Sequence, residues 1–363
     1  MEQPIAPEAS GAHPYQALTP DLVLDALDSV GLRGDGRLLA LSSYENRVYQ
    51  VALEQPLDID LGLGGAQTAV VAKFYRPGRW SDAQILEEHA FAAELMAADV
   101  PMVGPLVLHG ATLHRFGDFA FSISPRRGGR QPELDDFEVL EWIGRLLARI
   151  HLVGATRPFA ERPALDAARF GVASRDWLLA HETIPLDVRS EWISGCEEAL
   201  KLIAEIEAGT GASAGFDAIN RGDASTGRLR LHGDCHPGNL LWTPADQPGA
   251  GPHFVDLDDC VSGPAVQDLW MLLSGDRRER TIQLSALLDG YEQLRPFDRR
   301  ELILIEPLRT LRLIHYSAWL ARRWSDPTFP IHFPYFGSSD YWRGQVQMLH
   351  GQIEAMREPA LMV

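Results

Sequence analysis

Two short motifs, about twenty residues apart, constrain the fold of this chain more than any other feature. The first, LHGDCHPGNLLW at 231–242, places Asp234 five residues before Asn239 in the frame H-x-D-x-x-x-x-N. The second, HFVDLDDC, carries Asp256 within a β-like Phe-Val-Asp-Leu stretch. A phosphoryl-transfer site needs a carboxylate that accepts the proton of the attacking hydroxyl, and amide and carboxylate oxygens that hold Mg²⁺ against nucleotide phosphates. The spacing therefore indicates Asp234 as the base and Asn239 and Asp256 as the metal ligands.

Other interpretations of the first motif fit the residues less well. An Asp after a Gly is, taken alone, more often a turn former or a helix cap, but a random turn gives no reason for Asn239 and Asp256 at these offsets. His232 is expected to order the loop backbone rather than to transfer protons. A structural zinc site is disfavoured, because Cys235 and His236 belong to no four-ligand pattern such as paired C-x-x-C elements.

Three further acidic residues follow these motifs. Asp258 and Asp259 either help to hold a metal or a cationic substrate group or are simply solvated, and we expect them to be solvated. Asp268 falls in the first turns of the next expected helix. Its carboxylate is expected to hold backbone N–H groups of the loop around Asp234, which is a structural role.

Lys73 lies in AVVAKFY at 69–75, a β-branched run that predicts a strand. A lysine among apolar strand residues is costly unless its charge is met or it lies on a solvated face. Given the downstream loop, we expect Lys73 to contact the α- and β-phosphates and to pair with a carboxylate on the next helix. Glu87 and Glu88 are both available; we prefer Glu88, which lies three and seven residues before apolar positions of that helix.

The turn expected to cover the phosphates is SSYENRV at 42–48. Ser42 or Ser43, with adjacent backbone N–H groups, can cap the β- or γ-phosphate in place of glycines; the alternative is an ordinary hairpin turn. The Gly-rich stretch at 54–68 leads into a strand rather than a helix. It is therefore predicted to be a loop insertion and not a dinucleotide fingerprint.

The order of expected elements predicts an α+β chain with two lobes. Thr19 and Pro20 start a short helix as cap and first helical residue. The other elements before the hinge are strands and one main helix, at 38–53 (two strands), 69–75, 82–98 (the helix), 103–108 and 119–124. Glycines in SPRRGGR at 124–130 fit a hinge. We expect a disordered tail at 1–16, an N-lobe at 17–127 and a C-lobe at 128–363.

The second lobe is predicted to be mostly helical. Amphipathic helices are expected at 138–154 and 189–207, another starts at Gly263-Pro264, and three more follow up to about residue 356. One of these carries arginines and aromatic residues, namely Arg309, Arg312, Tyr316, Trp319, Arg322, Arg323 and Trp324. It can line a substrate groove, but we prefer amphipathic packing with a solvated basic edge.

Charge and composition exclude several classes of partner. The net charge of −17 argues against general nucleic-acid binding, which needs a basic footprint. No apolar run approaches the roughly 20 residues that span a bilayer, and the N-terminus lacks the basic start and apolar core of a secretion signal. The three cysteines form no disulfide framework. We therefore expect a cytoplasmic protein with neither nucleic acid nor membrane as a partner.

The motifs resemble those of the aminoglycoside phosphotransferase and choline-kinase-like superfamily, and more closely those of the bacterial stress response kinase A family of small serine/threonine protein kinases. The resemblance spans the chain from about residue 17. Its segments are SYENRVYQ (43–50), VAKFYRPGRW (71–80), QILEEH (84–89), RLHGDCHPGNLLW (230–242), FVDLDD (254–259), GPAVQDLWMLL (263–273), IEPLR (305–309) and AWLARRW (318–324). The chain departs from the family in insertions at 54–68, 207–228 and 244–252.

This resemblance implies a bilobal protein-kinase-like fold, with a small antiparallel sheet and one main helix in the N-lobe and a larger helical C-lobe. It implies ATP and Mg²⁺ as cofactors, phosphorylation of protein serine or threonine, autophosphorylation, a monomer, and a role in bacterial stress. It assigns Asp234 as the base, Asn239 and Asp256 as Mg²⁺ ligands, and Ser43 to the ATP site.

Two other functions stay open. A small-molecule kinase acting on an alcohol or amino-alcohol is the main alternative, because nothing in the catalytic loop separates the two acceptor classes. A degenerate, inactive scaffold is the third, and the presence of Lys73, Asp234, Asn239 and Asp256 disfavours it.

Overall fold

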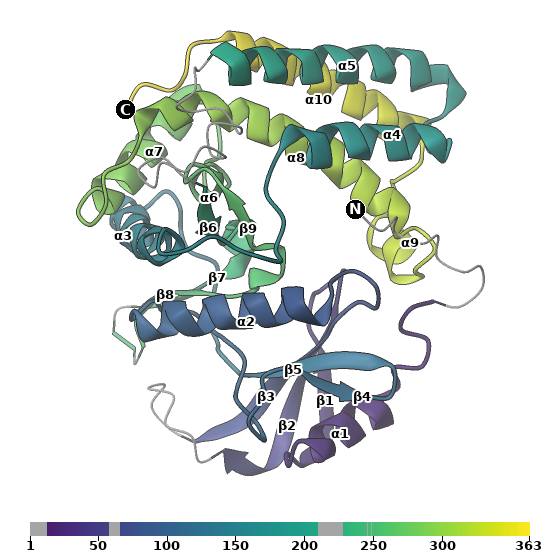
Figure 1. Cartoon of the computed structure of the whole chain (residues 1–363), viewed down its shortest axis with the longest axis vertical. Helices are drawn as coiled ribbons and strands as arrows, with labels where there is room; N and C mark the ends of the chain where they lie inside the picture. The colour runs from purple at the N-terminus through teal and green to yellow at the C-terminus, as the bar shows by residue number, and fades with distance from the viewer. Residues whose placement is uncertain (1–12, 58–65, 210–227, 245, 248) are drawn as a thin grey trace.

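A computed structural model describes residues 13–57, 66–209, 228–244, 246–247 and 249–363. The chain forms two lobes stacked along its long axis, a smaller one built on a β-sheet and a larger one built mainly of helices (Figure 1). The predicted α+β, bilobal fold is confirmed. The glycines of the insertion at 54–68 and most of the insertion at 207–228 lie outside the described residues. The lobe boundary at 127–128 stays a prediction.

The smaller lobe is a five-stranded antiparallel sheet in the order β1-β2-β3-β5-β4. Its strands are β1 (Gly34–Ala40), β2 (Arg47–Leu57), β3 (Gln67–Phe74), β4 (His114–Phe116) and β5 (Phe119–Pro125). Alternate residues of β3, including Val70, Ala72 and Phe74, are buried against α1 (Pro20–Ser29). The hydroxyl of Thr19 accepts the N–H of Leu22 and caps α1, as predicted.

The strand predicted at 103–108 is wrong. Val103 N donates to Phe254 O in the larger lobe, whereas Leu106 N donates to Ile123 O in β5. Pro105, which has no N–H to donate, lies between them, so the segment cannot continue a ladder along either partner. The strand beside β5 is β4, further along the chain.

The main helix of the smaller lobe, α2 (Asp82–Ala97), lies between the sheet and the larger lobe (Figure 1). A capping box starts it: the Ser81 hydroxyl accepts Gln84 N, and the Gln84 side chain accepts Ser81 N. This cap fixes where the helix begins. Two glutamates in its middle, Glu87 and Glu88, lie at the junction between the lobes.

The larger lobe packs around α3 (Phe137–Gly154), which lies against α7 (Arg277–Tyr291). A Cβ on Gly144 would lie 2.0 Å from Leu287 O, and one on Gly290 would lie 2.0 Å from Glu141 O, so the close approach of these helices requires glycine at both positions. The other helices are α4 (Ala173–Ala180), α5 (Leu186–Gly209), α6 (Gln267–Trp270), α8 (Ile305–Arg322), α9 (Thr328–His332) and α10 (Ser339–Arg357).

Both sequence motifs lie on short antiparallel strand pairs of the larger lobe. β6 (Leu229–Leu231) pairs with β9 (Val261–Gly263), and β7 (Leu240–Thr243) pairs with β8 (Gly251–Phe254). The helix expected from Gly263-Pro264 is shorter than predicted, since α6 begins at Gln267 and spans four residues. The two loops that carry the motifs, between β6 and β7 and between β8 and β9, therefore begin and end at hydrogen-bonded strand pairs.

The structure describes the last four residues of the predicted N-terminal tail, and the tail itself stays a prediction. Residues 13–16 of the expected tail form a turn, and Tyr15 is buried with its hydroxyl 3.1 Å from Glu45 O, to which it donates. The apolar ring of Tyr15 packs on Phe119 of the sheet. The first twelve residues lie outside the described ranges. Along the described ranges, no helix combines the length and the apolar character needed to cross a membrane.

Candidate functional site

The two motifs meet between β6, β7 and β8. Asn239 Nδ2 donates to the main-chain O of Asp234 at 2.9 Å and lies 3.5 Å from its Oδ2. Val255 N donates to Asn239 O at 3.1 Å, which brings Asp256, the next residue, to the same loop. The three residues predicted as base and metal ligands are therefore neighbours in space, although Asp256 comes from a different strand pair.

A buried carboxylate holds the backbone of this loop. Asp268 Oδ2 accepts His232 N at 2.9 Å, and Asp268 Oδ1 accepts Gly233 N at 2.8 Å. The His232 ring contacts Val255 O through Nε2 at 2.9 Å, so it ties the two motifs together. The predicted anchoring role of Asp268 and the ordering role of His232 are both confirmed.

Asp256 has a strained backbone. Its φ is 61° and its ψ 73°, the left-handed region that costs a non-glycine residue of order 1–3 kcal/mol. Its side chain is 49% exposed. The strain turns the carboxylate out of the β8 ladder toward the space between the lobes, where it is available to a ligand.

Lys73 of β3 reaches across to this loop. Its Nζ lies 3.1 Å from Asp256 Oδ1, 3.0 Å from Asp258 Oδ1 and 3.5 Å from Glu88 Oε1. Burial alone would lower the pKa of Lys73, but Asp256, Asp258 and Glu88 outweigh it and raise the pKa well above its usual value. Lys73 is therefore a charged link between the sheet and the candidate metal loop.

The two candidate partners of Lys73 have separate roles. Glu88 is buried beside Lys73, and burial, together with the nearby negative charge of Asp258, raises the pKa of Glu88 to about 7 against the lowering effect of Lys73. Glu87 instead accepts three backbone N–H groups of the larger lobe, at residues 160–162, over 2.6–2.8 Å. The geometry thus matches the prediction of Glu88 as the lysine partner.

The expectation that Asp258 is solvated is wrong. Asp258 is 3% exposed, and its carboxylate pairs with Lys73 and with Arg79. Burial would raise the pKa of Asp258, but Arg79 and Lys73 outweigh it and hold the pKa below its usual value. Asp259, whose side chain is half exposed, also pairs with Arg79. Arg79 lies in the loop after β3, so its arrival here cannot be read from the spacing of the acidic motif.

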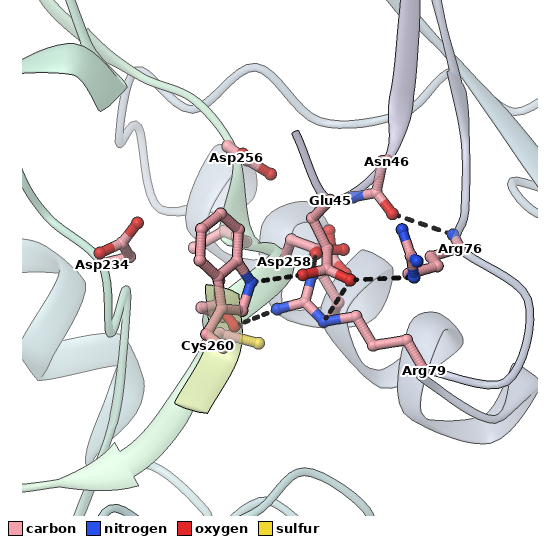
Figure 2. Close-up of polar contacts among 12 residues, drawn as sticks. Glu45, Asn46, Arg76, Arg79, Asp234, Asp256, Asp258 and Cys260 are labelled. Atoms are coloured by element: carbon pink, nitrogen blue, oxygen red, sulfur yellow. Dashed lines mark hydrogen bonds and ion pairs between the residues drawn. The ribbon is translucent and has the colours of Figure 1, made fainter. Parts of the chain in front are cut away.

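The turn between β1 and β2 is tied to the larger lobe rather than free. Trp319 Nε1 donates to Glu45 Oε2 at 2.6 Å, and Arg323 Nε lies 2.5 Å from the same oxygen. Arg76 and Arg79 lie 3.7 and 3.8 Å from Glu45 Oε1. Figure 2 shows Glu45 among these contacts, with Asp234 and Asp256 drawn apart from them.

Electrostatics favour the ionised form of Glu45 in this position. Burial would raise the pKa of Glu45, but Arg79, Arg323 and Arg76 together hold it below its usual value. Ser43, two residues earlier, is partly exposed at the start of the same turn. Its assignment to the ATP site stays a prediction.

A second ionic contact joins the lobes beside this one. Asp326, whose side chain is fully buried, accepts Arg47 Nη2 and Arg76 Nη1, each at 3.0 Å. The Asn46 side chain accepts Arg76 N at 3.1 Å. The start of β2 and the loop after β3 are therefore both fastened to the segment after α8.

Arg312 of α8 is the residue of the site that the sequence pattern missed. Its Nη1 lies 2.7 Å from Asp234 Oδ1, while His236 Nε2 lies 3.4 Å from Asp234 Oδ2. Burial would raise the pKa of Asp234, but His236 and Arg312 outweigh it and lower the pKa. Arg312 is exposed, as the preferred interpretation of a solvated basic edge expects, but it also pairs with Asp234, which that interpretation did not include. Its sequence signal is weak: an arginine on an amphipathic helix.

Comparison with known sequences bears on this site. The model of the phosphotransferase enzyme family matches residues 37–304. Stress response kinase A of Escherichia coli (strain K12) is 41% identical over 352 residues, which cover 97% of this chain and 98% of the relative. Serine/threonine protein kinase RdoA of Salmonella typhimurium (strain LT2) is 41% identical over 350 residues, which cover 96% of this chain and 97% of the relative.

Solved structures with little sequence similarity share the fold. Amicoumacin kinase hAmiN, in complex with AMP-PNP, Ca²⁺ and Ami, has a TM-score of 0.64 at 16% identity and covers 93% of each chain. The microcompartment-associated aminopropanol kinase has a TM-score of 0.64 at 17% identity and covers 93% of this chain and 96% of its own. These similarities extend over both lobes.

Proposed function

The chain belongs to the phosphotransferase enzyme family and, within it, to the stress response kinase A family, and from this premise we propose that it is an ATP- and Mg²⁺-dependent serine/threonine protein kinase that phosphorylates itself and acts in the bacterial stress response. One observation carries the proposal. In a chain 41% identical to a protein named as a serine/threonine kinase, Asp234, Asn239 and Asp256 lie on one loop cluster that Lys73 joins to the sheet.

The side chains fit a divalent metal. Asn239 uses Nδ2 to donate to the Asp234 main chain, so its Oδ1 is left as an acceptor. The half-exposed carboxylate of Asp256 supplies a second hard oxygen, which suits Mg²⁺ held by one or two protein ligands together with nucleotide phosphates. When bound, the metal neutralises charge on the transferring phosphoryl group.

The remaining residues supply position and proton transfer. With its pKa lowered, Asp234 is ionised at neutral pH and can accept the proton of an attacking hydroxyl. Lys73, released in part from its carboxylates, would contact the α- and β-phosphates, and Ser43 with its neighbouring N–H groups would cap the outer phosphates. In this proposal, the contacts of Glu45 with Trp319 and Arg323 would hold the turn that carries Ser43 near the nucleotide.

A small-molecule kinase is the second candidate. It is supported by the solved neighbours, whose titles name an amicoumacin kinase and an aminopropanol kinase, but at 16–17% identity these speak for the fold alone. The more similar relatives carry protein-kinase and stress-kinase names, which is why we place the protein acceptor first.

Incubation of the purified protein with labelled ATP and Mg²⁺, with and without a generic protein acceptor, tests the proposal. We expect label on serine or threonine, and we expect Asp234→Ala to abolish it. ADP release that depends on an added alcohol, without any labelled protein, would favour the small-molecule kinase instead. Nucleotide binding without turnover would indicate a scaffold.

A further inference from the structure

The guanidinium of Arg312 contacts Asp234, the candidate base. Its Nη1 lies 2.7 Å from Asp234 Oδ1 and 4.0 Å from Met271 Sδ. The side chain is 46% exposed. Within the described part of the chain, neither Nε nor Nη2 of Arg312 has a protein hydrogen-bond partner, and Asp234 is the one carboxylate that pairs with it. Arg312 thus has donors to spare for a ligand.

The other arginines of α8 differ from Arg312 in this respect. Arg309, one turn earlier, pairs with Glu306 and lies over the ring of Trp270. Arg322 is half-buried over the ring of Trp177, and Arg323, the C-cap of α8, is buried against Glu45. Arg312 is therefore the arginine of this helix that is both exposed and directed at the place where an acceptor hydroxyl must approach.

The face of α8 that carries Arg312 continues as a partly exposed aromatic surface. Tyr316 and Trp319 follow at four and seven residues, which puts them on the same face of the helix. Their rings stack with centroids 5.6 Å apart, and the Tyr316 hydroxyl lies 3.4 Å from the Tyr335 hydroxyl. Arg312 contacts Asp234 and Trp319 contacts Glu45, so this surface extends from the candidate base to the turn between β1 and β2. An extended acceptor segment can lie along it.

The charge beside the base decides which acceptors fit. A cationic amino-alcohol would meet the guanidinium of Arg312 and, on the other side of Asp234, the His236 ring; among the described residues, Asp234 is the carboxylate that pairs with both. An anionic group would instead find a planar guanidinium with free N–H donors, the geometry that matches carboxylates. It would also draw Arg312 away from Asp234 and leave that carboxylate free to accept the hydroxyl proton.

Resting on the protein-kinase function proposed above, we propose that Arg312 determines acceptor specificity, and that the preferred acceptor is a serine or threonine with an acidic side chain next to it. Selection acts at contact, because the net charge of −17 gives an acidic segment no long-range attraction and salt screens it beyond about 8 Å. The inference also separates this chain from amino-alcohol kinases, whose acceptor carries the opposite charge.

Matched peptides test the proposal directly. Two peptides with one central serine, flanked by either aspartates or lysines, are compared as acceptors for the full-length protein with Mg-ATP. Because a hydrogen bond to a charged group contributes about 1.5–3 kcal/mol, we expect kcat/KM to favour the acidic peptide by roughly 10- to 100-fold. Arg312→Ala should remove this preference through KM, Arg312→Glu should invert it, and Arg312→Lys should keep its sign.

Controls separate the ways in which the proposal can fail. Arg357→Glu makes the same change in net charge as Arg312→Glu, but Arg357 lies on α10, at the end of the larger lobe away from the sheet (Figure 1), and should leave the preference unchanged. An acidic preference that survives Arg312→Glu, no preference in the wild type, or an equal loss of kcat on both peptides in Arg312→Ala would each overturn the inference. If neither peptide is labelled by the wild type, the proposed protein-kinase function itself fails.

Discussion

Lys73 Nζ lies 3.1 Å from Asp256 Oδ1, although the two residues belong to different lobes and are 183 residues apart. The contact joins the strand that is expected to hold the phosphates to the loop that is expected to hold the metal. Lys73 and Asp256 neutralise each other here; with ligands bound, the nucleotide phosphates would pair with Lys73 and the metal would pair with Asp256. The predictions below follow from this arrangement and from the carboxylates around it.

Asp256→Ala should abolish turnover and weaken binding of Mg-ATP, because charge neutralisation at the phosphates is lost. Nucleotide titration over a range of Mg²⁺ concentrations measures this. Asp259→Ala is the matched control, since Asp259 is also half exposed and pairs with Arg79 rather than Lys73. If Asp256→Ala shows the same Mg²⁺ dependence as the wild type, its assignment as a metal ligand is wrong.

Asp234→Asn should keep ATP binding and lose most of kcat. General-base catalysis typically contributes about 10²- to 10⁴-fold, and an amide cannot accept the proton. The amide can still contact Arg312, so the loop should keep its structure. Single-turnover phosphorylation beside equilibrium nucleotide binding distinguishes the two effects. Near-normal turnover in the variant would mean that the base lies elsewhere.

Glu88→Gln and Glu87→Gln should affect different properties. Glu88→Gln removes a partner of Lys73, and we expect kcat/KM for ATP to fall about tenfold. Glu87→Gln weakens three hydrogen bonds to the larger lobe, and we expect it to lower the free energy of unfolding by about 1–3 kcal/mol with little change in kcat. Thermal melts and steady-state kinetics on both variants check the assignment, which an exchange of the two phenotypes would reverse.

Glu45→Gln should destabilise the protein at neutral pH by roughly 3 kcal/mol, the low end of the range for breaking a buried ion pair. The pKa of Glu45 is lowered in the folded state, so its contribution is present above the unfolded value of about 4.5 and is lost as pH falls through the folded value. The variant should therefore lose less stability than the wild type on acidification. Denaturant unfolding from pH 7 down to pH 3 measures this, and parallel curves would show that Glu45 is not the titrating group.

Local sequence spacing predicted what lies within one loop or one helix. The frame around Asp234 and Asn239 spans five residues, and the turn that forms it is set by flanking strands and by Asp268. Glu88 was identified because helical periodicity fixes which carboxylate faces inward. The predicted contacts of Asn239 with Asp234 and of Glu88 with Lys73 are present, because each prediction uses spacing within one loop or one helix; the roles of these residues stay predictions.

Contacts between distant segments were missed for the same reason. Arg79 meets Asp258 across 179 residues, Trp319 meets Glu45 across 274, and Arg312 meets Asp234 across 78. An arginine on an amphipathic helix or an aspartate beside a metal ligand has many possible partners, and only the tertiary packing selects one: between the lobes for Arg79 and Trp319, and within the larger lobe for Arg312. The strand predicted at 103–108 failed because its β-like residues are divided by Pro105 between two different partners.

The most direct test of the phosphoryl-transfer site is a crystal structure of the protein with Mg²⁺ and a non-hydrolysable ATP analogue. We predict a metal within about 2.0–2.1 Å of side-chain oxygens of Asn239 and Asp256, with the Asp234 carboxylate facing the γ-phosphate. A nucleotide bound away from these residues, or a metal that neither Asn239 nor Asp256 contacts, would contradict the assignment.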